Sequence, residues 1–217
     1  MMAQSRSSKK WLNRQNKDPY VREAKAFGYR SRAAFKLIEI QEKYQIVKPG
    51  MRVLELGAAP GSWTELLVEW VGENGQIFAV DLLEMAPIHG VTTRQDDIES
   101  DACFAWYHEI ASNGIDLVVS DMAPNMCGHQ RTDQLRSSRL VEVAYDISQN
   151  YLSEGGFFLA KSFNGVGFNE MLKALRSTFK RVKVIKPDAS RRESGEIYFL
   201  GIDKKPQDTV KGESLHE

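Results

Sequence analysis

Residues 52–63 read Arg-Val-Leu-Glu-Leu-Gly-Ala-Ala-Pro-Gly-Ser-Trp, and this stretch decides the fold. Val53, Leu54 and Leu56 follow a Lys-Pro-Gly turn and predict a short buried strand. The apolar positions that follow recur at helical spacing and predict a helix near residues 62–71, with Ser62 as its N-cap. A strand that passes through a tight turn into a helix is typical of an alternating α/β fold.

Two glycines shape the turn between this strand and this helix. Gly57 and Gly61 allow the backbone to turn sharply and to approach a ligand closely. Their spacing differs from the Gly-x-Gly-x-x-Gly dinucleotide motif, and the Gly-Lys-Ser/Thr of a phosphate loop does not follow. The turn therefore suits a ligand whose head group is not a triphosphate.

Acidic residues follow the next two predicted strands. Asp81 ends the apolar run that begins at Gln76, about 20 residues beyond the glycine turn, where a carboxylate can accept both hydroxyls of a ribose. Asp97 follows a third strand near 91–94 and is placed to accept from an adenine amino group. The ordered set of glycine turn, Asp81 and Asp97 indicates a cofactor that contains adenosine.

The remaining pattern alternates strands with helices, which predicts a mostly parallel α/β sheet with helices on both faces. The link at 187–195 is too short for a parallel crossover, so the last two strands are predicted to be antiparallel. We expect a mobile basic tail at 1–16, one domain at 17–203 and a disordered tail at 204–217. The seven predicted strands lie near 52–56, 76–80, 91–94, 115–120, 156–161, 181–185 and 197–202, and the helices near 31–44, 62–71, 101–111, 133–151 and 167–178.

Four charged residues lie at the edges of these predicted elements. Lys36 is in the helix near 31–44, Asp121 and Lys161 follow apolar strands, and Glu196 precedes one. Ligands of an open α/β sheet gather where strands end and the strand order reverses. Two lysines and two carboxylates are therefore expected to meet in one cleft beside the glycine turn, as a site for proton transfer and charge steering.

The chain resembles the FtsJ/RrmJ family of AdoMet-dependent ribosomal RNA ribose 2′-O-methyltransferases. The resemblance covers residues 11–203 in the family's order, and Ser62, where the family commonly has glycine, removes no functional group. It implies a Rossmann-like methyltransferase fold, a catalytic tetrad of Lys36, Asp121, Lys161 and Glu196, and AdoMet contacts from Gly61, Trp63, Asp81, Asp97 and Asp121. The matching stretches are 31–37, 48–63, 81–83, 120–125, 155–161 and 186–198.

The resemblance also implies a reaction and a substrate. The expected reaction methylates the ribose 2′-hydroxyl of a uridine in 23S rRNA of the large ribosomal subunit and aids ribosome maturation. Lys161 would be either the base that accepts the hydroxyl proton or a charged donor that orients the hydroxyl while water takes the proton. Two alternatives stay open, which are a 2′-O-methyltransferase for tRNA or mRNA caps and a non-catalytic RNA-binding assembly protein.

Composition agrees with a soluble RNA-binding enzyme. The net charge is zero, but lysine and arginine concentrate at 1–36 and 173–192, which is typical of phosphate binding. There is no apolar run of 18 residues and no signal-peptide core, so we expect no membrane span and a cytoplasmic location. Cys103 and Cys127 belong to no metal-binding pattern, so we expect free thiols and no structural metal. We further expect a monomer.

Overall fold

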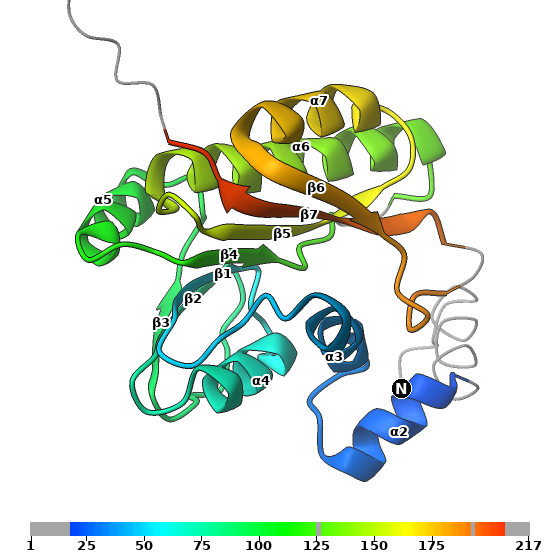
Figure 1. The fold of residues 1–217 in the computed structure, drawn as a ribbon. Helices are drawn as coiled ribbons and strands as arrows, with labels where there is room; N and C mark the ends of the chain where they lie inside the picture. Colours follow the sequence, from blue (N-terminus) through cyan, green and yellow to red (C-terminus); the bar gives the residue numbers. More distant parts are fainter. Residues whose placement is uncertain (1–17, 125–126, 192–193, 207–217) are drawn as a thin grey trace, which may run out of the picture.

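Seven strands form one sheet in the order β3-β2-β1-β4-β5-β7-β6, and helices cover both of its faces in the computed structural model (Figure 1). The structure describes residues 18–124, 127–191 and 194–206. The strands are β1 (Arg52–Leu56), β2 (Gln76–Asp81), β3 (Val91–Gln95), β4 (Leu117–Ser120), β5 (Phe157–Phe163), β6 (Phe179–Ile185) and β7 (Glu196–Lys204). The helices are α2 (Pro19–Phe27), α3 (Ala33–Tyr44), α4 (Ser62–Val71), α5 (Asp101–Ala111), α6 (Gln130–Tyr151) and α7 (Phe168–Thr178).

The strand directions agree with the predicted fold class. β1 lies in the centre and pairs in parallel with both β2 and β4, while β3 and β5 extend the parallel part of the sheet. The predicted antiparallel pair of β6 and β7 is confirmed. β7 also runs antiparallel to β5, because it inserts between β5 and β6. The start of β7 therefore lies beside the end of β5, at the edge of the sheet where the parallel strands terminate.

The core consists of two apolar layers, one on each face of the sheet. Phe158 packs into the layer under α5, α6 and α7, whereas its neighbour Leu159 packs into the layer under α3 and α4. This alternation follows from the two-residue period of a strand that is buried on both faces. α3 is thereby held against the sheet by Leu37 and Ile40, both fully buried, so that the side chain of Lys36 is fixed near the strand ends.

Helix α2 is absent from the predicted elements. Asp18 caps it by accepting a hydrogen bond from the amide of Tyr20 at 3.1 Å, Pro19 occupies its first turn, and Gly28 ends it with a φ of 79°. This order of capping Asp, Pro and terminal Gly is a recognisable helix signal. The signal was missed because the segment was interpreted through its basic charge alone.

Two further local predictions differ from the structure. The N-cap of α4 is Gly61, and no side chain caps this end, so the prediction of Ser62 as the cap is wrong. The hydroxyl of Ser62 instead donates to the hydroxyl of Ser31, 2.7 Å away, and ties α4 to the segment before α3. Strand β7 continues to Lys204, the first residue of the predicted C-terminal tail. The tail prediction for 1–16 and most of that for 204–217 lie outside the described residues. Within the described part of the chain, no helix is long and apolar enough to cross a membrane.

Candidate active site

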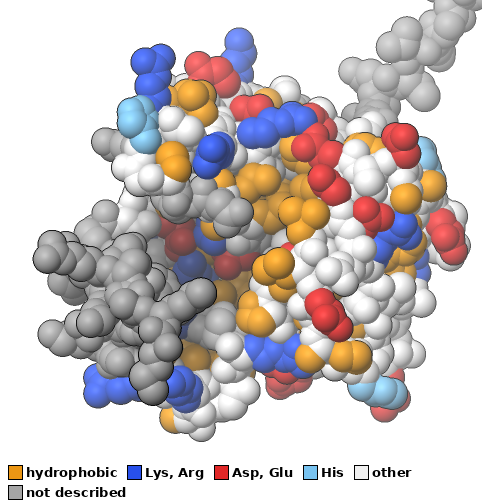
Figure 2. Space-filling view, turned by 180° about the vertical axis from the view of Figure 1, so that it is seen from behind, with side chains coloured by type: hydrophobic (Ala, Val, Ile, Leu, Met, Phe, Trp, Pro, Cys, Tyr) orange, Lys and Arg blue, Asp and Glu red, His pale blue; other side chains and the backbone are white. Residues whose placement is uncertain are grey.

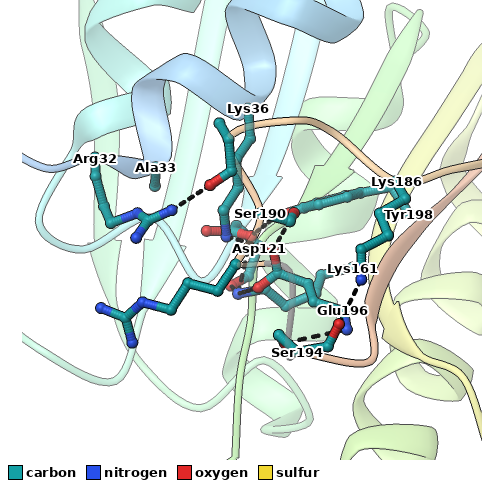
Figure 3. Close-up of polar contacts among 12 residues, drawn as sticks. Arg32, Ala33, Lys36, Asp121, Lys161, Lys186, Ser190, Ser194, Glu196 and Tyr198 are labelled. Carbon is teal, nitrogen blue, oxygen red and sulfur yellow. Dashed lines mark hydrogen bonds and ion pairs between the residues drawn. The ribbon is translucent and has the colours of Figure 1, made fainter. Parts of the chain in front are cut away.

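The four predicted tetrad residues converge from four different elements (Figure 3). The ammonium group of Lys36 on α3 lies 2.7 Å from a carboxylate oxygen of Glu196 at the start of β7. The ammonium group of Lys161 on β5 lies 2.9 Å from a carboxylate oxygen of Asp121, which follows β4. Lys161 also lies 4.0 Å from the second oxygen of Glu196 and thereby joins the two ion pairs into one network.

The network is largely removed from solvent. Lys36 and Lys161 are 8% and 9% exposed, and burial of such charges is tolerated only when they are paired. Burial alone would raise the pKa of Asp121, but the positive charges of Lys161 and Lys36 outweigh it and lower that pKa below its ordinary value. Asp121 is therefore an anion at neutral pH, and the site presents two buried cations with their two carboxylate partners.

Tyr198 is a fifth member of the site that the sequence reasoning missed. Its phenol donates a hydrogen bond to the same oxygen of Asp121 that faces Lys161, and its ring lies 5.8 Å below the Lys36 ammonium group. Burial, reinforced by the charge of Asp121, raises the pKa of Tyr198 well above its ordinary value, so the phenol stays protonated. A signal was present, because Tyr198 is two residues beyond Glu196 on β7 and so points to the same face.

The loop before β7 positions Glu196. The hydroxyl of Ser190 donates to Glu196 Oε1 at 2.7 Å, the same oxygen that contacts Lys36. This loop is fastened to the N-terminal helices by Arg32, whose guanidinium contacts both Asp18 and the carbonyl of Ala189. The position of one tetrad carboxylate therefore depends on contacts with the helix α2 that the sequence reasoning overlooked.

The two predicted cofactor glycines have the backbone shapes that glycine allows. Gly57 and Gly61 have φ values of 77° and 99°, where other residues are strained. A side chain at position 57 would place its Cβ 2.3 Å from a carbon of Met122, so the missing side chain lets the Asp121–Met122 segment pack directly on the turn. The turn therefore brings Asp121 of the tetrad beside the predicted cofactor loop.

Asp81 lies at the edge of a pocket of about 200 Å³, as its predicted role requires. Its two carboxylate oxygens accept hydrogen bonds from the amides of Ala59 and Leu83 at 2.9 and 2.8 Å. A carboxylate has about four lone-pair sites, so these two bonds leave acceptors for further donors. The other lining residues are Ala58, Ala79, Leu83, Glu84, Met85, Thr93, Arg94 and Gln95.

Asp97 and Trp63 lie differently from what their predicted role suggests. Asp97 is exposed, does not line the Asp81 pocket, and accepts from the amide of Glu99 at 3.0 Å. Trp63 is 2% exposed, its indole N–H donates to the carbonyl of Ala33 at 2.8 Å, and its ring packs against Tyr198. The Trp63 indole thus ties α4 to the start of α3.

Glu55 is a buried acid that the sequence reasoning did not single out. It lies on β1 below the glycine turn, is 2% exposed, and accepts a hydrogen bond from the hydroxyl of Thr64 at 2.6 Å. Burial raises the pKa of Glu55 to about 8, with smaller contributions in the same direction from the charges of Asp121 and Asp81. Glu55 is therefore mostly neutral at pH 7 and adds little negative charge to a site that already holds two carboxylates.

Several of the basic residues predicted to contact RNA form ion pairs within the chain. Arg30 lies 2.6 Å from Glu65, and both Arg32 and Arg191 contact Asp18. Other members of the two basic stretches are exposed: Arg22 and Lys25 on α2, Lys173 and Arg176 on α7, and Lys180, Arg181 and Lys183 on β6. On the face drawn in Figure 2, charged side chains of both signs are interspersed. The tail 1–16 lies outside the described residues.

Comparison with known proteins identifies relatives over nearly the whole chain. Residues 29–204 match the model of the FtsJ-like methyltransferase family. Ribosomal RNA large subunit methyltransferase E of Francisella tularensis is 46% identical over 94% of this chain and 100% of its own length. The protein of the same name from Acidithiobacillus ferrooxidans is 47% identical over 93% of this chain and 92% of its own length.

Solved structures give the same fold. A ribosomal RNA methyltransferase from Plasmodium falciparum superposes with a TM-score of 0.73 at 29% identity and covers 82% of this chain and 100% of its own. Fibrillarin from Aeropyrum pernix, solved with bound S-adenosyl-L-methionine, has a TM-score of 0.56 at 18% identity over 80% of this chain and 75% of its own. The second likeness concerns the fold alone.

Proposed function

We propose a specific reaction for this chain, which belongs to the FtsJ-like methyltransferase family. The enzyme transfers the methyl group of AdoMet to the ribose 2′-hydroxyl of a uridine in 23S rRNA of the large ribosomal subunit. The observation that carries the proposal is the buried network of Lys36, Asp121, Lys161 and Glu196 beside the glycine turn. The relatives named as large-subunit rRNA methyltransferases support the choice of RNA. We place the enzyme in the cytoplasm, where it acts as a monomer.

The residues at the glycine turn fit an adenosine cofactor. Asp81 retains acceptors for the ribose hydroxyls, and the pocket beside it lies at β2 and β3. Gly57 and Gly61 give the turn its positive-φ shape. AdoMet would supply a methyl group activated by a sulfonium. Asp121 then serves two purposes, because it is an anion close to the turn and it also holds Lys161.

Lys161 is the group that we assign to the substrate hydroxyl. Its ammonium group contacts the side chain of Asp121 at 2.9 Å and the backbone carbonyl of Asp121 at 2.8 Å. A lysine ammonium has three N–H donors, so one remains to bind the 2′-oxygen and orient its lone pair toward the methyl carbon. These acceptors favour a charged donor, with water taking the hydroxyl proton, over a neutral amine that takes the proton itself.

The other two tetrad residues position the substrate. Glu196 holds the ammonium group of Lys36, and the hydroxyl of Ser190 in turn holds Glu196, so both tetrad side chains are fixed in place. Fixed groups of this kind hold the 2′-oxygen, the methyl carbon and the sulfur in line. Proximity and alignment together can lower a reaction barrier by as much as roughly 7–11 kcal/mol.

One experiment tests the reaction and its substrate together. The protein is incubated with labelled AdoMet and, separately, with large ribosomal subunits, naked 23S rRNA, tRNA and capped mRNA, and labelled sites are mapped for 2′-O-methylation. We expect label at one uridine of 23S rRNA within the large subunit. Label in tRNA or caps, or on a base rather than a ribose, would overturn the assignment. A protein that binds subunits without any transfer would be an assembly factor.

A further inference from the structure

A second pocket, of about 290 Å³, opens beside the tetrad on the α6 side of the sheet. We call it the α6 pocket. It is lined by Asp133, Gln134 and Ser137 of α6, by Phe163 and Asn164 at the end of β5, and by Ser194 and Gly195 before β7. None of its lining residues belongs to the tetrad or to the predicted cofactor contacts.

Three polar side chains of the α6 pocket, those of Ser137, Gln134 and Asn164, have no hydrogen-bond partner among the described residues. Ser137 is 6% exposed, and its hydroxyl oxygen is buried without a hydrogen bond in the described part of the chain. A buried polar atom in this state costs roughly 1–3 kcal/mol, so it points to a missing ligand. No hydrogen bond joins the side-chain amides of Gln134 or Asn164 to any other described residue. Gly165 leaves space for the Gln134 amide, because a Cβ there would lie 2.9 Å from its nitrogen.

The described lining of the α6 pocket offers no cation to a phosphate group. Among the described residues it contains no lysine or arginine. It does contain Asp133, whose carboxylate accepts the amides of Cys127 and Gly128 at 2.8 and 3.0 Å. These hydrogen bonds, that of the Cys127 amide first, lower the pKa of Asp133. The described lining therefore combines one carboxylate with neutral amide and hydroxyl groups beside an aromatic residue, which suits a nucleobase.

The position of the α6 pocket relative to Lys161 fits one nucleotide. Phe163 is two residues beyond Lys161 on β5, a separation of about 6.6 Å along a strand, and it pairs in register with Glu196. The carbon that bears the 2′-hydroxyl is bonded directly to the carbon that bears the base. A ribose held at Lys161 must therefore place its own base within a few ångströms.

We propose that the α6 pocket receives the base of the nucleotide whose ribose is methylated, with Gln134 and Asn164 hydrogen-bonding its edge. The inference rests on the proposed function, because it assumes a ribose at Lys161. The base leaves its stack in the RNA to enter the pocket, and the unpaired amides and the Ser137 hydroxyl replace the hydrogen bonds that it loses. This contact would align the 2′-hydroxyl as well as select the nucleotide.

The test compares the parent enzyme and two variants on two substrates. Large subunits are reconstituted with 23S rRNA that carries either uridine or an abasic ribose at the nucleotide mapped for the parent enzyme, and kcat/KM is measured for each. Gln134→Ala and Asn164→Ala should each lower kcat/KM on the uridine substrate by roughly three- to tenfold, the worth of one hydrogen bond. On the abasic substrate they should change it less than twofold, because the contact is already lost.

The controls distinguish loss of the base contact from loss of the fold and from failure of the proposed function. Ser138→Ala alters the neighbouring helix position, whose hydroxyl contacts Glu142 at 2.9 Å outside the pocket, and should leave both substrates unchanged. Asn164 is exposed, so its truncation should preserve the fold, which AdoMet affinity and circular dichroism check. If both alanine variants match the parent, or lose equally on the two substrates, the pocket does not hold the base. If the parent enzyme methylates neither substrate, the proposed function itself fails.

Discussion

Tyr198 donates its phenolic hydrogen bond to Asp121, although the two residues are 77 positions apart in the chain. The oxygen of Asp121 that accepts this bond is also the one closest to Lys161. The phenol therefore fixes the carboxylate from one side while the ammonium group holds it from the other. This contact links β7 to the segment after β4, which packs on the glycine turn.

Tyr198→Phe should lower methyl transfer by roughly tenfold or more. The ring would still pack on Trp63 and under Lys36, but Asp121 would lose a hydrogen bond to a charged acceptor, worth about 1.5–3 kcal/mol. Single-turnover transfer to large subunits at saturating AdoMet measures the effect. Tyr145→Phe is the matched control, since that buried phenol bonds Thr178 on the far side of α6. Equal activities of the two variants would exclude a role for the Tyr198 hydroxyl.

Lys161→Ala should abolish nearly all transfer, because it removes both the donor to the hydroxyl and the partner of Asp121. Lys161→Arg separates the two roles of this lysine. Arginine keeps the positive charge but does not deprotonate in proteins. A loss as severe as that of alanine is expected for a base, whereas activity within a few-fold of the parent identifies a charged donor. AdoMet binding, measured by calorimetry, should persist in both variants.

Asp81→Ala should weaken AdoMet binding by roughly 1–3 kcal/mol, the cost of leaving the ribose hydroxyls unpaired. The variant also releases the amides of Ala59 and Leu83. Asp81→Asn retains one acceptor and should fall between the parent and the alanine variant. Asp97→Ala, at an exposed position outside the pocket, tests the adenine contact separately. Calorimetric affinity that is unchanged in Asp81→Ala would remove the ribose assignment.

Glu55→Gln should become increasingly stable relative to the parent as pH rises. The folded chain keeps Glu55 protonated up to a pKa of about 8, whereas the unfolded chain loses that proton near 4.5. The unfolded parent therefore binds fewer protons in this window, and parent stability falls between about pH 4.5 and 8. Glutamine does not titrate, so its stability lacks this dependence on pH. The free energy of unfolding of Glu55→Gln minus that of the parent should therefore grow by a few kcal/mol between pH 4.5 and 8, as the size of the pKa change implies. Urea unfolding at pH 5, 6.5 and 8 measures it, and a constant difference would contradict a neutral Glu55.

Removal of residues 1–16 should weaken RNA binding and flatten its dependence on salt, while AdoMet binding stays intact. Each phosphate contact that is lost reduces the slope of log affinity against log salt by about 0.7–0.9. The expectation rests on Arg6, Lys9, Lys10 and Arg14 in that tail. A slope equal to that of the full chain would show that the tail does not contact phosphate.

The sequence by itself determined the local elements, the mostly parallel sheet and the antiparallel direction of the last two strands. The bounds of β1, α4 and α5 were predicted to the residue, because a buried strand and an amphipathic helix each carry a period that only nearby residues set. The resemblance to a known family supplied the tetrad, and the structure brings its four members together. The hydrophobic periods and the family motifs can both be recognised because each lies within a short, contiguous stretch of sequence.

Only the tertiary structure decided which side chains form hydrogen bonds and ion pairs with each other. The two-residue spacing places Tyr198 on the same face as Glu196, but no local pattern shows that its phenol contacts Asp121. Nor does the chain show locally that the Trp63 indole faces Ala33, or that Arg32 joins Asp18 to the loop before β7. Hydrogen bonds and ion pairs depend on distances of a few ångströms between residues that are far apart in sequence. Those distances are set by how β7 inserts between β5 and β6, and this pairing brings the α6 pocket to the side of Lys161.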